Sequence, residues 1–204
     1  MTQQLLSWHA LPADVAPDAS LLPGVHLLLD ALDEARHRLL PWLAGTHSAP
    51  APAQVRCGDW VGGSSDYRAQ VLSVPLTDYA PEQSIADWLT QQRQRWPQWN
   101  EAAWQQHVQG FALEPHLGKS WWQLSTGTLR KVWQAGSLAS GAPITLIDAP
   151  DAGLDLASIR YLSRALNQLA EQLAADATPR WVLVLHYDTL PDMEWDEVVE
   201  LPGS

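Results

Sequence analysis

Two polar side chains stand where an apolar, strand-like run ends, and both side-chain types can take part in chemistry. Asp148 follows Ile144–Ile147, and His186 follows Val182–Leu185. An aspartate in such a place can ligate a metal ion, and a histidine can transfer a proton near neutral pH. Each also has a structural alternative, because Asp148 could cap a turn with Pro150 and His186 could be a hydrogen-bonded residue at a strand end.

The sequence predicts no metal site built from histidine and cysteine. Cys57 is the single cysteine, which excludes an internal disulfide and a multi-cysteine zinc site. Five of the histidines show no spacing that is typical of metal ligands: His9, His26, His47, His107 and His116.

Three continuous apolar runs predict the strands that would position these side chains: Val25–Leu29, Ile144–Ile147 and Trp181–Leu185. Strands that are apolar on both faces are typical of a covered, largely parallel sheet. Between the last two runs, Ala157–Ala174 carries leucines at helical spacing, which completes a strand–helix–strand unit. An α/β sandwich with a helical insertion follows from these elements alone.

Composition limits the classes of function. The chain has 204 residues, 46% of them apolar, so we expect one domain or one domain with an inserted lobe. A net charge of -11 argues against a nucleic-acid partner and against direct lipid binding. No apolar run approaches the roughly 20 residues of a membrane-spanning helix, and no secretory leader is recognisable, so we expect a soluble, cytoplasmic protein.

Three short motifs in the second half of the chain occur in an order that is informative about its family. The segment Leu124–Thr128 reads LSTGT, Ile144–Asp155 reads ITLIDAPDAGLD, and a strand-like run leads directly into His186. Together with Pro23–Leu29 and Arg38–Gly45 upstream, they resemble the nucleotide-binding domain of ABC-type ATPases, from the phosphate-loop helix to the switch histidine.

The resemblance covers about Leu5 to Leu201 and implies a P-loop NTPase-like α/β fold. Such a fold has a largely parallel central sheet, an N-terminal antiparallel β part and an inserted helical subdomain. We expect a single domain over 1–204, with an N-terminal core half (1–76), a helical subdomain (77–123) and a C-terminal half that begins with the signature helix (124–204).

The phosphate loop departs from the family pattern. Asp30, Asp33 and Ala35 stand where glycines belong, Arg36 takes the lysine position and His37 the Ser/Thr position. Backbone amides, the lysine and the hydroxyl would otherwise hold phosphates and Mg²⁺. We therefore expect Arg36 and His37 to be solvated or paired with Asp33, rather than to bind phosphate.

We expect the carboxylates of this segment to occupy the anion-binding site that the phosphate loop would otherwise form. Asp30 could cap the following helix, and Asp33 or Glu34 could lie in its first turn, where the helix dipole favours negative charge. These charges would repel a triphosphate.

The residues that would act on the chain's own nucleotide are also changed. Asp148 matches the metal-side aspartate, but Ala149 stands at the general-base glutamate position and cannot accept a proton. Leu76 stands where the resemblance places the Q-loop glutamine, and Trp8 is a candidate for the adenine-stacking aromatic.

The residues that would act on a partner's nucleotide are better matched. Ser125 and Gly127 match the signature residues that contact the opposite γ-phosphate, Asp155 matches the D-loop, and His186 matches the switch. The structural alternatives are that Ser125 or Thr126 caps a helix and that Asp155 shapes a loop. No intrinsic cofactor is expected; ATP and Mg²⁺ could bind at a site shared with a partner subunit.

The aromatic residues are unusual, with 12 tryptophans against one phenylalanine. Half of the tryptophans fall between the Q-loop-like segment and the signature, where the resemblance places the surface that receives a transmembrane partner. Trp88, Trp96, Trp99 and Trp104 could form a docking surface, because tryptophan is enriched at binding hot spots. Alternatively, they supply the core bulk that phenylalanine usually provides.

Three functions compete. The first is a degenerate ABC-type subunit, inactive alone, that pairs as a heterodimer with a competent ABC ATPase and a permease at the inner face of a membrane. It would lend LSTGT and the D-loop to the partner's ATP site. The second is a non-catalytic scaffold with the same fold. The third is an active ATPase in which Arg36 replaces the lysine.

Overall fold

A computed structural model describes residues 4–47, 52–76 and 79–203. Five parallel strands form its central sheet in the order β6-β7-β8-β3-β9. Their bounds are Gly24–Leu29 for β3, Val71–Val74 for β6, Ile144–Asp148 for β7, Trp181–His186 for β8 and Glu197–Glu200 for β9. All three predicted strands are confirmed, and they lie side by side as β7, β8 and β3.

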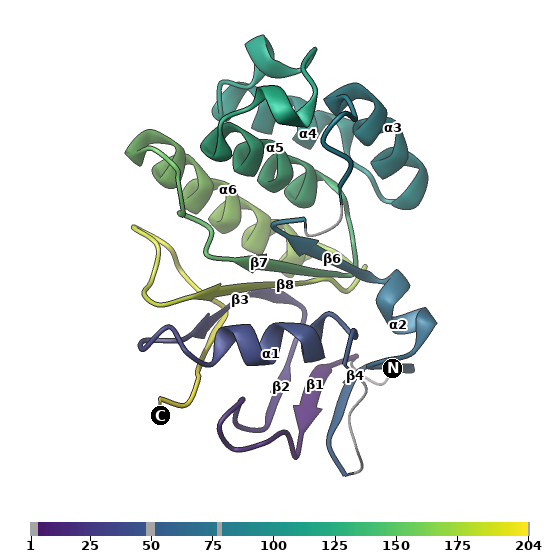
Figure 1. Cartoon of the computed structure of the whole chain (residues 1–204). Helices are drawn as coiled ribbons and strands as arrows, with labels where there is room; N and C mark the ends of the chain where they lie inside the picture. Colours follow the sequence, from purple (N-terminus) through teal and green to yellow (C-terminus); the bar gives the residue numbers. More distant parts are fainter. Residues whose placement is uncertain (1–3, 48–51, 77–78, 204) are drawn as a thin grey trace.

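The apolar runs are continuous because both faces of the sheet are covered (Figure 1). Along β8, Val182 and Val184 pack into the core beneath the helical layer, whereas Leu183 and Leu185 pack into the core on the opposite face. Successive side chains of a strand point to opposite faces, so two cores require an apolar residue at every position. The middle strands therefore show no polar alternation.

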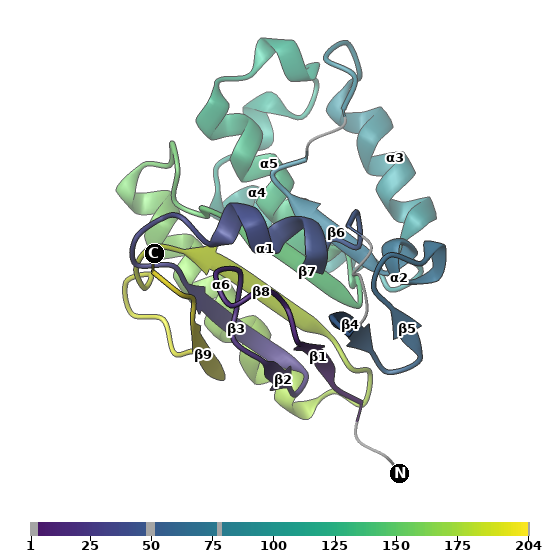
Figure 2. The ribbon, with the colours of Figure 1, turned by 60° about the horizontal axis from the view of Figure 1, so that its bottom comes forward.

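The smaller sheet is antiparallel and lies with α1 on one side of the large sheet (Figure 2). Its strand order is β2-β1-β4-β5. The elements are β1 (Leu6–His9), β2 (Ala19–Leu21), β4 (Gln54–Cys57), β5 (Trp60–Val61) and α1 (Arg36–Leu43), and the short α2 (Ser65–Ala69) leads into β6. The mixed α/β architecture with an antiparallel N-terminal part is confirmed.

The other helices lie on the opposite side of the large sheet (Figure 1). They are α3 (Ile85–Arg95), α4 (Glu101–Gly110), α5 (Thr126–Ala139) and α6 (Leu156–Ala175), with single turns η1 (Glu114–His116) and η2 (Trp121–Gln123). In α6 the predicted leucine stripe faces the core, with Leu162 and Leu166 fully buried.

The tryptophans of this layer form its core, so the predicted docking surface is wrong for three of its four residues. Trp88, Trp96 and Trp104 are at most 4% exposed, and Trp99 is half-buried against the same core. Trp88 meets Trp121 edge to face, with ring centroids 5.4 Å apart. The indoles pack between the helices together with leucine, isoleucine and valine side chains of the same core. Trp122, by contrast, is 64% exposed.

Within the described ranges, no helix is both long and apolar enough to cross a membrane.

Candidate functional site

The carboxyl edge of the large sheet gathers the polar residues singled out above. Asp148 ends β7 and His186 ends β8, its neighbour, while Asp30 follows β3 on the other side of β8. The backbone amide of Asp30 donates to the carbonyl oxygen of His186 over 2.8 Å. The parallel register therefore places three strand ends at one site.

Arg36 occupies the centre of this edge. Its guanidinium donates from Nε to Asp33 Oδ1 over 2.5 Å and from Nη1 to Asp148 Oδ1. Its backbone amide donates to Asp30 Oδ2 over 2.8 Å, so Asp30 caps the start of α1 as predicted. The hydrogen bond from Arg36 holds the pKa of the Asp33 carboxyl below its ordinary value. One arginine thus ties together three carboxylates.

The turn before α1 differs from the prediction in one respect. Asp33 and Glu34 do not lie in the first helical turn, because α1 begins at Arg36. Asp33 takes a left-handed conformation with φ of 59°, which turns the chain and directs its carboxylate back to Arg36. His37 is exposed, so the expected pairing with Asp33 applies to Arg36 alone.

His186 is held on both sides of its ring. Nε2 lies 2.9 Å from Asp151 Oδ1, and Nδ1 lies 2.6 Å from the carbonyl oxygen of Asp188. The ring is 2% exposed, and these two contacts fix its orientation. The structural alternative for His186 is therefore realised, and Asp151 is the partner that the sequence could not identify.

Ser125, Gly127 and Asp155 form a second group around the start of two helices. Ser125 caps α5, accepting from the Thr128 amide over 3.2 Å, and Asp155 caps α6, accepting from the Ser158 amide over 2.9 Å. Lys131 donates to Asp155 over 2.6 Å, and this bond lowers the pKa of Asp155.

Gly127 packs directly on the loop between β7 and α6. A Cβ at Gly127 would lie 2.4 Å from the carbonyl oxygen of Gly153. The same loop contacts Arg130, whose Nη1 donates to the Ala149 carbonyl over 3.0 Å. Residues 149–155 therefore contact both groups of site residues: His186 at the strand ends and the signature-like segment at the start of α5.

Two other expected nucleotide contacts are not available. Trp8 is fully buried, and its Nε1 donates to the Pro17 carbonyl over 2.7 Å, so the suggestion that it stacks adenine is wrong for this conformation. Ala149 follows β7 with φ of 45° and offers only a methyl group beside Asp148.

A cavity that reaches Asp148 is mostly apolar. It has a volume of about 420 Å³ and lies between α1 and β6, with Asp148 at its border and Arg68 as its basic residue. Across the described residues, no cluster of three or more His, Cys, Asp or Glu side chains could hold a metal ion. The mostly apolar lining of this cavity differs from the ring of backbone amides that binds phosphates.

The fold is that of the ATP-binding subunits of ABC transporters. An ABC transporter ATP-binding protein from Pyrococcus furiosus is similar with a TM-score of 0.70 and 16% identity, over 97% of this chain and 96% of that one. An ATP-binding subunit of an ABC transporter gives 0.67 at 18% identity, over 90% and 78% of the two chains. A metal-chelate type ABC transporter in an inward-facing conformation gives 0.63 at 18% identity, over 92% and 74%. No protein-family model and no curated protein matches the sequence.

Proposed function

We propose that this chain is a catalytically impaired ABC-type subunit that acts beside a competent ABC ATPase in a transport complex. The observation that carries the proposal is the contact of Arg36 with both Asp33 and Asp148. A Walker-type site needs open amides for phosphate and a free aspartate for Mg²⁺. Here Arg36 engages that aspartate, so the residues do not fit Mg–ATP in the chain's own phosphate loop.

Charge supports the same conclusion. Asp33 and Glu34 are exposed at the turn, and Asp30 uses one oxygen to cap α1. A triphosphate placed there would meet carboxylates at short range, each costing on the order of 1 kcal/mol even at high dielectric. The isolated subunit is therefore expected to be inactive, a pseudoenzyme within the ATPase fold.

The signature-like group is the part proposed to act, in a heterodimer, on ATP held by the partner. Ser125 lies at the start of α5, a 14-residue helix whose N-terminus favours anions. Ser125, Gly127 and Asp155 would complete the partner's ATP site, and a permease would hold both subunits at the cytoplasmic face of a membrane. ATP and Mg²⁺ would then belong to the shared site.

The test is the ATPase rate of a complex between this chain and an intact ABC ATPase, for which the neighbouring reading frames are the first place to search. Ser125→Asp keeps a good helix cap but removes the hydroxyl donor and adds a charge that repels phosphate. We expect it to reduce the rate at least tenfold, whereas Ser125→Thr, which keeps hydroxyl and cap, should retain most of it. Equal rates for the two variants would instead favour the second candidate, a scaffold with the ABC fold. The turn in which Arg36 contacts Asp33 and Asp148 also supports this candidate.

A further inference from the structure

Arg180 is a buried cation without an anionic partner. It precedes β8 at the amino edge of the large sheet, opposite to the edge that holds Arg36, and is 7% exposed. In the described part of the chain, no carboxylate forms an ion pair with it. A buried charge is costly unless an opposite charge compensates it.

The hydrogen bonds of Arg180 all go to neutral oxygens. Nη1 donates to the Leu138 carbonyl over 3.3 Å, and Nη2 donates to the Ser137 carbonyl over 2.8 Å. Nε has no partner. Burial lowers the pKa of the guanidinium to about 10, as expected of a cation that lacks a compensating charge. These bonds satisfy carbonyl acceptors at the end of α5 but leave the positive charge in place.

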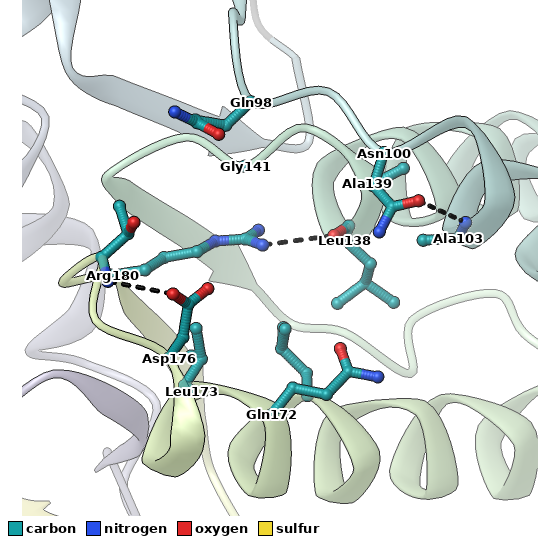
Figure 3. A pocket seen from close by; sticks show the side chains of 12 residues that line it. Gln98, Asn100, Ala103, Leu138, Ala139, Gly141, Gln172, Leu173, Asp176 and Arg180 are labelled. Carbon is teal, nitrogen blue, oxygen red and sulfur yellow. Dashed lines mark hydrogen bonds between the residues drawn. The ribbon is translucent and has the colours of Figure 1, made fainter.

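A cavity of about 250 Å³ lies against this side chain. Figure 3 shows Arg180 extending across it, with Gln98 and Gly141 on one side and Leu173 and Gln172 on the other. Asn100 caps α4 through Oδ1, which accepts from the Ala103 amide over 3.0 Å and leaves its amide nitrogen for another partner. The positive end of α4 thus borders the cavity as well.

We propose that this cavity, the Arg180 pocket (Gln98, Asn100, Gly141, Gln172, Asp176 and Arg180), binds a small carboxylate. One guanidinium and the amide groups of the pocket match the single charge and planar oxygens of a carboxylate. Asp176 is the negative residue of the pocket, and its Oδ1 accepts from the Thr178 amide over 3.0 Å. Its negative charge acts against any anion, so the guanidinium of Arg180 and the neutral amides are the groups that favour a carboxylate.

The Arg180 pocket is independent of the proposed transport function, because it lies at the opposite edge of the sheet. The probe is ¹³C-labelled acetate, titrated against the full chain and followed by its NMR linewidth, with chloride holding the ionic strength constant. We expect saturable binding to the wild-type protein. Inorganic phosphate should not displace acetate; displacement at equal concentration would overturn the assignment to a carboxylate.

Two matched variants decide where acetate binds. Gln172→Glu places a negative charge on an exposed position of the pocket rim and should weaken acetate binding about tenfold. Gln123→Glu adds the same charge at a position that does not line the pocket and where Glu can keep the capping box, and it should leave binding unchanged. Arg180→Met should abolish binding. Equal acetate affinity of the two glutamate variants, or absence of saturable binding to the wild type, would overturn the proposal.

Discussion

Arg36 holds the turn between β3 and α1 through its contacts with three aspartates. Its side chain is 10% exposed and lies between Asp33 and Asp148, with the amide held by Asp30. An ion pair that is largely removed from water resists opening, because separating it leaves uncompensated charges. A Mg²⁺ ion would have to displace Arg36 before Asp148 could ligate it.

Gly127 shows at the residue scale why a signature-like motif need not signal catalysis. Gly127→Ala should lower the free energy of unfolding by about 1–3 kcal/mol, because the new Cβ meets the backbone oxygen of Gly153 and neither can move cheaply. Urea unfolding of the isolated chain measures this. Gly118→Ala is the control, since a Cβ there has no neighbour within 4 Å. Equal stability of the two variants would show that the loop yields without cost.

Among the elements, the loop between β7 and α6 connects the two groups of site residues. It contacts His186 through Asp151, α5 through Gly153, and Arg130 through the Ala149 carbonyl. A change in the position of α5 therefore reaches the strand ends through this segment, so a partner that binds the start of α5 would also act on the edge that holds Asp148.

The tryptophans of the helical layer give a prediction at the same scale. Trp88→Ala should cost about 3–5 kcal/mol, because it empties a site in the core beside Trp121. Trp122→Ala should change stability by less than about 0.5 kcal/mol, because the side chain is mostly exposed. Thermal or urea unfolding of both variants measures the difference. A large loss at Trp122 and none at Trp88 would contradict this assignment of core and surface.

The strands could be predicted from the sequence because burial on two faces leaves an unbroken apolar run, as in Trp181–Leu185. The capping roles of Asp30 and Ser125 follow from local chemistry and were also predictable. The pairs Arg36–Asp148 and Lys131–Asp155 join residues far apart in the chain, and no local pattern marks them. Whether the tryptophans are buried or exposed could not be predicted for a similar reason, because helical spacing alone does not show which face of a helix is covered.

At the scale of the whole molecule, two buried histidines make stability depend on pH. Burial lowers the pKa of His107 from 6.5 to about 4, and burial also lowers the pKa of His26. Between these pH values the unfolded chain binds a proton on His107 that the folded chain does not. The free energy of unfolding therefore falls as the pH falls from 6.5 to 4, by about 3 kcal/mol for His107.

Urea unfolding at pH 7 and pH 4 tests this dependence. The His107→Gln variant should lose less stability than the wild type between pH 7 and pH 4. Part of the pH dependence of its free energy of unfolding should remain, because His26 is still present. His37→Gln, at an exposed position, is the control and should follow the wild type. A variant at His107 with the full wild-type slope would show that the proton uptake lies elsewhere.

We propose that Arg36 and the carboxylates around it close the chain's own phosphate loop. The most direct measurement is an equilibrium titration of the purified chain with a fluorescent ATP analogue and Mg²⁺. We expect no saturable binding and no ATP turnover by the same preparation. Micromolar affinity in the isolated chain would contradict it and would favour an active ATPase in which Arg36 replaces the phosphate-loop lysine.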